Sequence, residues 1–348
     1  MTYYIDQDCS ESDWRLVDLD IPGLTERVAA LVAQPVSDVR RMTGGASSLT
    51  FTASIDPDGS AQPAVIKVAP PGLAPTLNRD VLRQARILRA LAPAQGIPVP
   101  SVLGEDLGEP PEVPPLFVMT RAPGGCIEPI THPTEHDLPT PEEVEARALA
   151  AAGILAAIHD CDLEALGITD EPVMDLSAEV QRWMRVFSTT PEDLSTGAQA
   201  VGEALLGSLP GPVPPKLIHG DFRLGNLVCE GLQVTAVIDW EIWAVGDPRI
   251  DLGWWMMSTH PSKQPNALRV AEGMPDDRRL IAAYEAAAGP TVADLTWFDA
   301  LSRYKAGAMT ALILKHDRRS EDRNPVVEAW DPHVPTGFVR LAAECLES

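Results

Sequence analysis

The chain has 348 residues and carries 27 Lys and Arg against 50 Asp and Glu, which gives a formal net charge of −23. Its length corresponds to about two domains of ordinary size, and its hydrophobic fraction of 45% is sufficient for a buried core. The acidic balance, with no block rich in Lys or Arg, excludes a protein that follows a nucleic-acid backbone and disfavours one that docks on anionic membranes.

The first third of the chain predicts a small antiparallel sheet with one main helix. Helical spacing of apolar residues covers 22–34 and, more strongly, 76–92. The β-type runs, separated by turn sequences, cover residues 36–42, 48–55, 64–68, 101–103 and 116–120. The order of these elements, three strands, the main helix and two more strands, predicts a five-stranded sheet.

The rest of the chain predicts a mostly helical region. The sequence Pro123-Gly124-Gly125 breaks the β pattern, and we place the domain boundary there, with one lobe at 1–122 and another at 123–348. Helical patterns then cover residues 140–159, 175–188, 192–208, 251–259, 276–288 and 292–315. A short β island at 217–238 interrupts them. The chain is therefore expected to be an α+β protein with a sheet-rich and a helix-rich part.

Cysteine usage and the N-terminus bear on the compartment. The five cysteines are far apart, are odd in number and form no C-x-x-C pair, so they predict neither a disulfide framework nor a zinc site. Residues 1–14 are polar and acidic and do not resemble a signal peptide, and no run of 18 apolar residues occurs. We expect a cytoplasmic protein without a membrane segment. The oligomeric state stays open.

The β island carries the candidate chemistry. It contains HGDFRLGN from residue 219 and IDWE from residue 238, so Asp221 and Asn226 are five residues apart and Asp239 follows thirteen residues later. A hairpin over 227–238 would return the chain to Asn226. Phosphoryl transfer needs one carboxylate to orient the attacking hydroxyl, and an amide and a second carboxylate to hold Mg²⁺. Each residue alone is usually a turn or cap residue, but the joint pattern favours this chemistry.

Two features of the first lobe complement this set. Gly44, Gly45, Ser47 and Ser48 lie between two β runs, where glycines let backbone N–H groups approach phosphates, although a Gly-Gly turn alone is more often a plain hairpin. Lys67 lies within an apolar β run, where a buried cation needs an anionic partner. Alone it could be an edge-strand lysine facing water, but with the downstream motif it is predicted to bind phosphate.

At these residues the sequence resembles the aminoglycoside phosphotransferase and choline-kinase-like family, which has the protein-kinase fold. The resemblance is most detailed to a branch related to the kinase-like domain of acyl-CoA dehydrogenase fusion proteins, and it covers about residues 25–320. The shared motifs are GGAS, VIK, GIPVP, FVM, HGDFRLGNL and IDWE with the following GDPRIDLGW. This resemblance implies a bilobal fold, with a nucleotide-binding lobe of five antiparallel strands and one main helix before a mostly helical catalytic lobe.

The resemblance also implies residue roles, with ATP and Mg²⁺ as cofactors. Asp221 would be the catalytic base, and Asn226 and Asp239 would bind Mg²⁺. The remaining nucleotide contacts would be the loop residues Gly44, Gly45, Ser47 and Ser48 over the phosphates, Lys67 at the α- and β-phosphates, and backbone atoms near Met119 and Arg121 at the adenine. His219 would orient the loop. Asp251 would either hold the catalytic segment or act as a simple helix cap, which is the reading we prefer.

Two departures from the family pattern keep a second function open. Gln84 stands where the family has the Glu that pairs with Lys67, and Asp80 on the same helix face is a candidate substitute. Ser48 stands where relatives often have Asn. The first hypothesis is an ATP- and Mg²⁺-dependent kinase for a hydroxyl of a small molecule. The alternative is a nucleotide-binding pseudokinase that serves as a regulatory or partner module.

The acceptor is the least specified part of the first hypothesis. Aminoglycoside-like, choline-like and hydroxyacyl compounds all fit, and the acidic charge suits a cationic or neutral molecule. The acceptor region is expected in the helices between 140 and 210 and after 251. Four tryptophans either line an apolar pocket of the acceptor region or belong to the ordinary core: Trp183, Trp243, Trp254 and Trp255. GTP in place of ATP also stays open.

Overall fold

The computed structural model divides the chain into two units, Met1–Gly124 with Thr235–Ile242 and Gly125–Val234 with Trp243–Ser348. The residues that the structure describes are 19–42, 48–56, 59–134, 136–289, 293–320, 323, 327 and 330–347. Gly44, Gly45 and Ser47 lie outside the described residues. The predicted division assigned residues 235–242 to the second lobe, whereas the structure groups them with the first unit.

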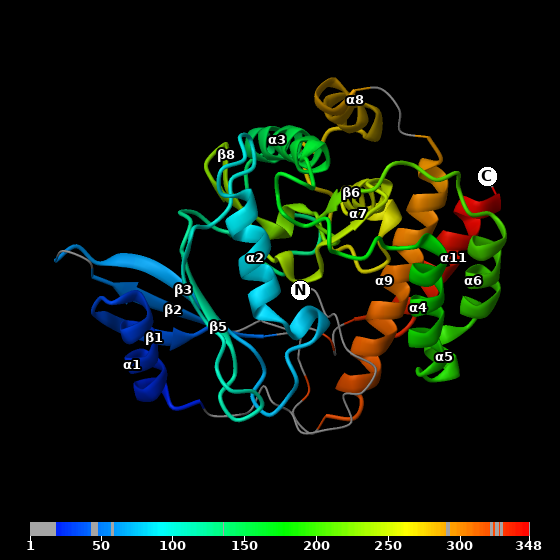
Figure 1. Cartoon of the computed structure of the whole chain (residues 1–348). Helices are drawn as coiled ribbons and strands as arrows, with labels where there is room; N and C mark the ends of the chain where they lie inside the picture. The colour runs from blue at the N-terminus through cyan, green and yellow to red at the C-terminus, as the bar shows by residue number, and fades with distance from the viewer. Residues whose placement is uncertain are drawn as a thin grey trace. The chain divides into compact units, whose positions relative to one another are not determined.

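A five-stranded antiparallel sheet forms the centre of the first unit, with strand order β1-β2-β3-β5-β4 (Figure 1). The strands are β1 (Val36–Arg41), β2 (Leu49–Ile55), β3 (Gln62–Val68), β4 (Val102–Asp106) and β5 (Leu116–Thr120). This sheet confirms the predicted α+β class and the predicted strand number. The predicted strands differ from the observed ones by only a few residues at their ends.

Side-chain alternation divides the two faces of this sheet. Helix α1 (Ile21–Val32) buries Val28 against a cluster that includes Phe51 and Ile66 on one face. Because successive side chains of a strand point to opposite faces, Lys67 points away from this cluster. Lys67 is paired in register with Thr50 of β2 and Phe117 of β5, so it lies on an interior strand and not at a solvent-facing edge.

Helix α2 (Val81–Leu91) follows a short 3₁₀ turn, η2 (Leu77–Arg79), and contacts β4 and β5. The Asp80 carboxylate accepts hydrogen bonds from the backbone N–H groups of Leu82 and Arg83, which caps the helix. Helix α2 also contacts η4 (Trp240–Ile242), the 3₁₀ turn within the returning segment 235–242. The main helix and the IDWE motif therefore belong to one packed unit.

The second unit is mostly helical, as predicted. Its helices are α3 (Pro141–Asp160), α4 (Leu176–Ser188), α5 (Glu192–Ser195), α6 (Ala198–Gly207), α7 (Arg249–Met257), α8 (Asp277–Ala288), α9 (Leu295–Asp317) and α11 (Val334–Glu347). Helix α9 is buried over most of its length and contacts α4, α6, α7 and α11 (Figure 1). Across the described parts of the chain, no helix combines the length and the apolar character needed to span a bilayer.

Short strands flank the HGD motif of the second unit. Strand β6 (Lys216–Ile218) pairs antiparallel with β9 (Ala244–Gly246), a strand that the sequence pattern did not reveal. Strands β7 (Leu227–Glu230) and β8 (Gln233–Val237) form the predicted hairpin. The segment 219–226, which we call the HGD loop, connects β6 to β7 and ends in the 3₁₀ turn η3 (Leu224–Asn226).

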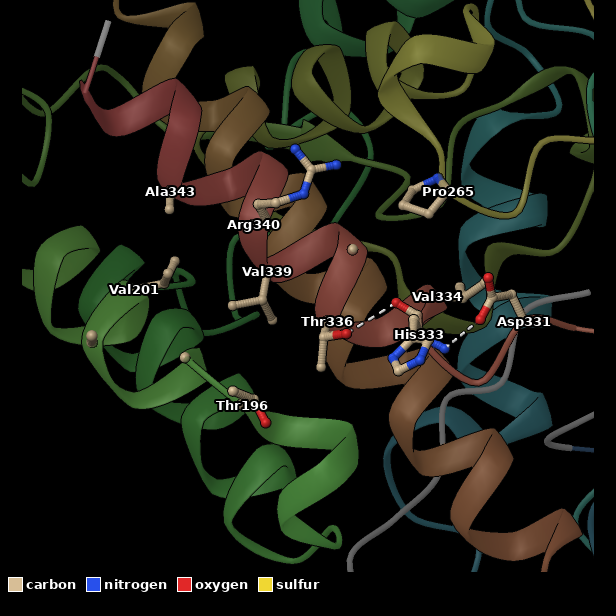
Figure 2. A pocket seen from close by; sticks show the side chains of 13 residues that line it. Thr196, Val201, Pro265, Asp331, His333, Val334, Thr336, Val339, Arg340 and Ala343 are labelled. Atoms are coloured by element: carbon tan, nitrogen blue, oxygen red, sulfur yellow. Dashed lines mark hydrogen bonds between the residues drawn. The ribbon is translucent and has the colours of Figure 1, made fainter.

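A cavity lies among α6, α11 and the residues that precede each of them (Figure 2). Val201 and Val339 give it an apolar wall, and Arg340 lines it as well. His333 and Thr336 also line it, where the Thr336 hydroxyl donates to the His333 carbonyl at 3.1 Å. None of the predicted site residues lines this cavity.

Candidate active site

The HGD loop holds Asp221 in a buried position, with 1% of the residue exposed. The Trp254 indole N–H donates to Asp221 Oδ1 at 2.6 Å, and Asn226 Nδ2 donates to Asp221 Oδ2 at 2.6 Å. The Arg223 Nε–H lies 3.4 Å from Oδ1. Donors from three side chains therefore fix the orientation of this carboxylate and stabilise its charge. The structure brings together two predicted site residues, Asp221 and Asn226, and adds Trp254 and Arg223 to them.

The hydrogen bonds of Asn226 also determine where its oxygen points. Its Nδ2 donates both to the Asp221 carboxylate and to the Asp221 backbone carbonyl, at 2.8 Å for the latter. A carboxylate accepts and does not donate, so the NH₂ group must face Asp221 and the amide oxygen must face away from it. This orientation suits the predicted role of Asn226 as an oxygen ligand.

A buried carboxylate from α7 holds the backbone of the HGD loop. Asp251 is fully buried; its Oδ2 accepts from the His219 N–H and its Oδ1 from the Gly220 N–H, each at 2.7 Å. Gly220 has φ +84°, a left-handed conformation that favours glycine. Helix α7 has Pro248 as its N-cap, so the preferred interpretation of Asp251 as a simple cap is wrong. Asp251 anchors the loop instead.

Neighbouring hydrogen-bond donors stabilise the negative charge of the buried Asp251 carboxylate. His159 Nε2 lies 3.3 Å from Asp251 Oδ2. Burial alone would raise the pKa of Asp251, but the hydrogen bonds from the His159 side chain and the His219 backbone act against it, and that pKa lies below its usual range. The anchor is therefore ionised at neutral pH.

Replacing this anchor gives a stability prediction with a defined pH dependence. We expect Asp251→Asn to lower the free energy of unfolding by about 3 kcal/mol at pH 7, because an amide leaves at least one buried loop N–H without an acceptor. A depressed carboxyl pKa contributes stability above the unfolded-state pKa of about 3.9, and this contribution is lost as the pH falls through the folded-state value. The difference between the two proteins should therefore shrink below about pH 4.

Urea unfolding at pH 7, 5 and 3.5 measures this difference. Asp193→Asn, at an exposed Asp193–Arg318 pair in the same unit, is the control and should change stability little at any pH. A difference between wild type and Asp251→Asn that is constant down to pH 3.5 would contradict the ionised anchor.

Glu128 is a neighbour of the HGD loop that the sequence analysis missed. Its Oε2 accepts from the Gly225 N–H at 3.1 Å and lies 3.4 Å from Arg223 Nη1. Its side chain is 10% exposed, and burial raises the pKa of this carboxyl despite the opposing charge of Arg223. Within the described residues, its other oxygen, Oε1, is buried without a hydrogen-bond partner. Glu128 and Asp221 thus hold the Arg223 guanidinium from two sides.

Lys305 of α9 places a second cation beside the same loop. Its Nζ donates to the Gly220 carbonyl at 2.7 Å, and the residue is only 4% exposed. The ammonium lies 4.3 Å from the ring centroid of Trp254, the indole that donates to Asp221. Lys305 therefore contacts both the backbone and the side chain that adjoin Asp221.

In the first unit, Lys67 forms an ion pair with Asp239, with 3.3 Å between Nζ and Oδ1. Burial lowers the pKa of Lys67, but the charges of Asp239 and Glu241 outweigh it, so the pKa lies above its usual value and the ammonium stays charged. Asp239 has φ +67°, a left-handed conformation that is uncommon for a residue with a side chain. Such strain often occurs at functional sites.

Lys67 has anionic partners other than the helix glutamate that the family pattern predicts. Gln84 is buried in α2, and among the described residues its Nε2 has no hydrogen-bond partner. The carboxylate of Asp80, the candidate substitute, caps the N-terminus of α2 instead. The carboxylates that stabilise the Lys67 ammonium in this unit are Asp239 and Glu241, which follow strand β8.

The other predicted nucleotide contacts lie around the same sheet. Ser48 is buried directly before β2, and its Oγ has no hydrogen-bond partner within the described part of the chain. Met119 is buried in β5. The Arg121 N–H already donates to the Pro63 carbonyl at 3.0 Å, so a contact from Arg121 to a purine would use another of its atoms. Ser48 Oγ and Gln84 Nε2, which lack partners among the residues that the structure describes, suit a polar ligand in this unit.

The donor set also suits the implied metal. Asn226 offers an amide oxygen and Asp239 a carboxylate, the hard oxygen ligands that Mg²⁺ prefers. Within the described ranges, no group of three or more His, Cys, Asp or Glu side chains could hold a metal ion. Mg²⁺ needs no such group, because it keeps several waters and usually binds one or two protein carboxylates together with substrate phosphates.

A five-stranded sheet with a paired lysine, together with a helical unit that carries an anchored HGD loop, is the arrangement of kinase-like phosphotransferases. The model of the phosphotransferase enzyme family matches residues 38–301. The chain belongs to this family.

Curated relatives share this part of the chain. Mouse acyl-CoA dehydrogenase family member 10 is 30% identical over 210 residues, which is 58% of this chain and 19% of that protein. Human acyl-CoA dehydrogenase family member 11 is 26% identical over 302 residues, which is 80% of this chain and 37% of that protein. Viomycin phosphotransferase of Streptomyces vinaceus is 30% identical over 182 residues, covering 49% of this chain and 59% of that enzyme. The chain thus spans well under half the length of the acyl-CoA dehydrogenase relatives.

Solved structures share the fold at lower identity. A Ralstonia eutropha protein solved as a candidate aminoglycoside phosphotransferase has a TM-score of 0.75 and 22% identity, covering 95% of this chain and 99% of that one. The aminoglycoside phosphotransferase APH(4)-Ia, solved with AMP-PNP and hygromycin B, has a TM-score of 0.61 and 19% identity, covering 92% and 99%. These likenesses confirm the kinase-like fold.

Proposed function

We propose that the protein transfers the terminal phosphate of ATP to a hydroxyl group of a small molecule. The observation that carries this proposal is the buried Asp221 carboxylate, which Trp254 and Asn226 orient through its two oxygens. Membership of the phosphotransferase family supports it, as does the nucleotide analogue in the related APH(4)-Ia structure.

Asp221 is the proposed base. It would accept the proton of the acceptor hydroxyl while the hydroxyl oxygen forms a bond to the terminal phosphorus and the bond from that phosphorus to the ADP oxygen breaks. The donors from Trp254, Asn226 and Arg223 restrain the carboxylate, so little reorganisation is needed when the proton moves. Asp251 and Lys305 act one step further out, by holding the backbone of Gly220.

The remaining roles concern the phosphates. Asn226 and Asp239 would hold Mg²⁺, which when bound neutralises charge on the phosphates. Lys67 would contact the α- and β-phosphates, and its ammonium is charged for this purpose. Ser48, with its unpartnered buried hydroxyl among the described residues, would add a hydrogen bond beside Gly44, Gly45 and Ser47. Gln84, Met119 and Arg121 complete the proposed nucleotide contacts.

The charges around Asp221 bear on the choice among aminoglycoside-like, choline-like and hydroxyacyl acceptors. Arg223 and Lys305 place two cations beside the carboxylates Asp221 and Glu128. This balance gives a polycation no electrostatic advantage at the reacting oxygen, despite the net charge of −23. We therefore propose a neutral or anionic alcohol, such as a hydroxyacyl compound, ahead of an aminoglycoside.

A screen for ADP formation tests the proposed function. Purified protein with Mg²⁺ and ATP is offered cationic sugars, cholines and hydroxyacyl thioesters, and thermal shift reports binding of each compound. We expect acceptor-dependent ADP formation with at least one class, strongest for a neutral or anionic alcohol. The proposal is wrong if Mg²⁺ and ATP produce neither a thermal shift nor ADP with any acceptor.

Gln84→Glu separates an active kinase from the pseudokinase alternative. Because Asp239 and Glu241 already stabilise the Lys67 charge, we expect this change to alter the turnover rate by less than about threefold, or well under 1 kcal/mol of barrier. ADP formation at saturating ATP and acceptor measures it. A wild-type protein that binds nucleotide without turnover, and is unchanged by Gln84→Glu, would instead support a pseudokinase.

A further inference from the structure

We propose that Tyr284 of α8 is a positioning residue for the HGD loop and acts through His159 and Asp251. The effect on catalysis rests on the proposed function, whereas the effect on the loop itself does not. Neither the HGD motif nor the IDWE motif includes Tyr284, which lies 63 residues beyond Asp221 in the sequence.

A continuous buried chain of hydrogen bonds connects Tyr284 to the loop. The Tyr284 hydroxyl lies 2.8 Å from His159 Nδ1, and His159 Nε2 lies 3.3 Å from Asp251 Oδ2. Asp251 in turn accepts from the His219 and Gly220 N–H groups. Tyr284 is 6% exposed, His159 3% and Asp251 0%. Three helices, α8, α3 and α7, thus contribute one residue each to a path that ends at the backbone beside Asp221.

The direction of these bonds follows from the chemistry of the groups. The Asp251 carboxylate only accepts, so His159 Nε2 must carry a proton. In the neutral imidazole Nδ1 then has a lone pair, and the Tyr284 hydroxyl donates to it. Burial raises the pKa of Tyr284 to about 12, and the Asp251 charge adds to this effect, so the phenol keeps its proton at neutral pH. Tyr284 therefore reinforces the imidazole tautomer that donates to Asp251.

Removal of the Tyr284 hydroxyl alone should weaken the hold on the His159 ring. In Tyr284→Phe, His159 Nδ1 is left buried without its donor, so the imidazole loses one of the two hydrogen bonds that fix its ring and its tautomer. The bond from Nε2 to Asp251 then holds the ring alone and is weakened. Asp251 then shifts or loses part of its hold on the His219 and Gly220 N–H groups. Because the phenyl ring still fills the site beside Leu280, the packing of α8 is retained.

The chain supplies a matched control. Tyr304 of α9 is buried as well, but within the described residues its hydroxyl has no hydrogen-bond partner. Tyr304→Phe removes the same atom from a buried ring without breaking a hydrogen bond among the described residues. It should leave both loop protection and turnover unchanged.

Amide hydrogen exchange of the full chain, resolved by NMR, tests the loop coupling without an acceptor. We expect the His219 and Gly220 amides to exchange about tenfold faster in Tyr284→Phe than in wild type, because the coupling is about one buried hydrogen bond in strength. Tyr304→Phe should match wild type. Unchanged exchange at both amides in folded Tyr284→Phe would overturn the proposal, as would an equal increase in Tyr304→Phe.

A second variant keeps the test valid if Tyr284→Phe folds poorly. His159→Gln interrupts the path one step nearer to the loop, so it should accelerate the same two amides. Adding Tyr284→Phe to His159→Gln should then produce no further acceleration, since the two residues act in series. Additive effects of the two substitutions would overturn the coupling.

The kinetic readout separates positioning from general stability. With the best acceptor, Tyr284→Phe should lower kcat about three- to tenfold while the KM for ATP stays within about twofold, because the change acts on the base and not on the nucleotide site. Faster loop exchange with unchanged kcat would overturn the positioning role. Faster loop exchange with no turnover in the wild-type protein would support the loop coupling but overturn the proposed function.

Discussion

Asp221→Asn is expected to lower kcat by about 10³-fold while the affinity for Mg²⁺–ATP changes little. An amide cannot take the proton of the acceptor hydroxyl at neutral pH. The residue is 1% exposed, and the amide is nearly the same size as the carboxylate, so the variant should fold. Initial rates of ADP formation measure kcat, and calorimetric titration with a non-hydrolysable ATP analogue measures affinity.

Two controls make this result specific. Asp193→Asn, at an exposed ion pair of the same unit, should keep full activity. The Asn226 NH₂ group faces Asp221 Oδ2, so the new amide must present its oxygen there or lose that bond. Circular dichroism and thermal unfolding therefore accompany the assay. Activity within tenfold of wild type in a folded Asp221→Asn protein would contradict the assignment of the base.

The second large effect is expected for Lys67→Met, which should lower kcat/KM for ATP by at least about 10²-fold. The substitution removes the cation predicted to contact the phosphates. It also leaves the charges of Asp239 and Glu241 without their neighbouring ammonium, which adds repulsion against an incoming polyanion. Because Lys67 lies in an interior strand of the sheet, Met retains the aliphatic packing of its stem.

Lys263→Met is the matched control for Lys67→Met. Lys263 is as little exposed as Lys67, with 13% for each side chain, and likewise pairs with a carboxylate, Asp277. It belongs to none of the proposed contacts, so its replacement should leave kcat/KM for ATP unchanged. Equal losses in the two variants would show that the effect comes from lost ion pairing and not from nucleotide binding.

Local patterns were sufficient to predict most elements. Runs of β-type residues between turn sequences located all five strands, and the helix-start sequence at Thr140 and Pro141 located the start of α3. The predicted helix over 192–208 is two helices, because Gly197 adopts φ +80° between α5 and α6. Helix α11 was missed, since Pro335 and Gly337 within it conceal its apolar periodicity.

Contacts in the site were predictable where the residues are close in sequence and not where they are far apart. Asp221 and Asn226 are five residues apart, and their contact follows from the motif that contains both. The contact of Asp221 with Trp254 spans 33 residues, that of Arg223 with Glu128 spans 95, and that of Gly220 with Lys305 spans 85. Such contacts depend on tertiary packing, which a motif within one segment does not encode. Trp254 alone carried a signal, as the last residue of the GDPRIDLGW motif, although its bond to Asp221 was not predicted.

The carboxylates that stabilise Lys67 were likewise too distant in sequence to be predicted. The family pattern predicts the partner of Lys67 on the main helix, where Gln84 and Asp80 share one face. The carboxylates that stabilise Lys67 instead come from Asp239 and Glu241, in a segment more than 170 residues away. The absence of the family's glutamate is therefore a weaker argument for a pseudokinase than the sequence alone suggested.

Quantification of both products in one reaction tests the central claim most directly. Protein, Mg²⁺, ATP and the best acceptor are incubated, and ³¹P NMR with mass spectrometry measures ADP, inorganic phosphate and phosphorylated acceptor. We predict one phosphate ester for each ADP formed, and neither product above background with Asp221→Asn. ADP accompanied only by inorganic phosphate, or bound nucleotide without any ADP, would contradict transfer to a hydroxyl group.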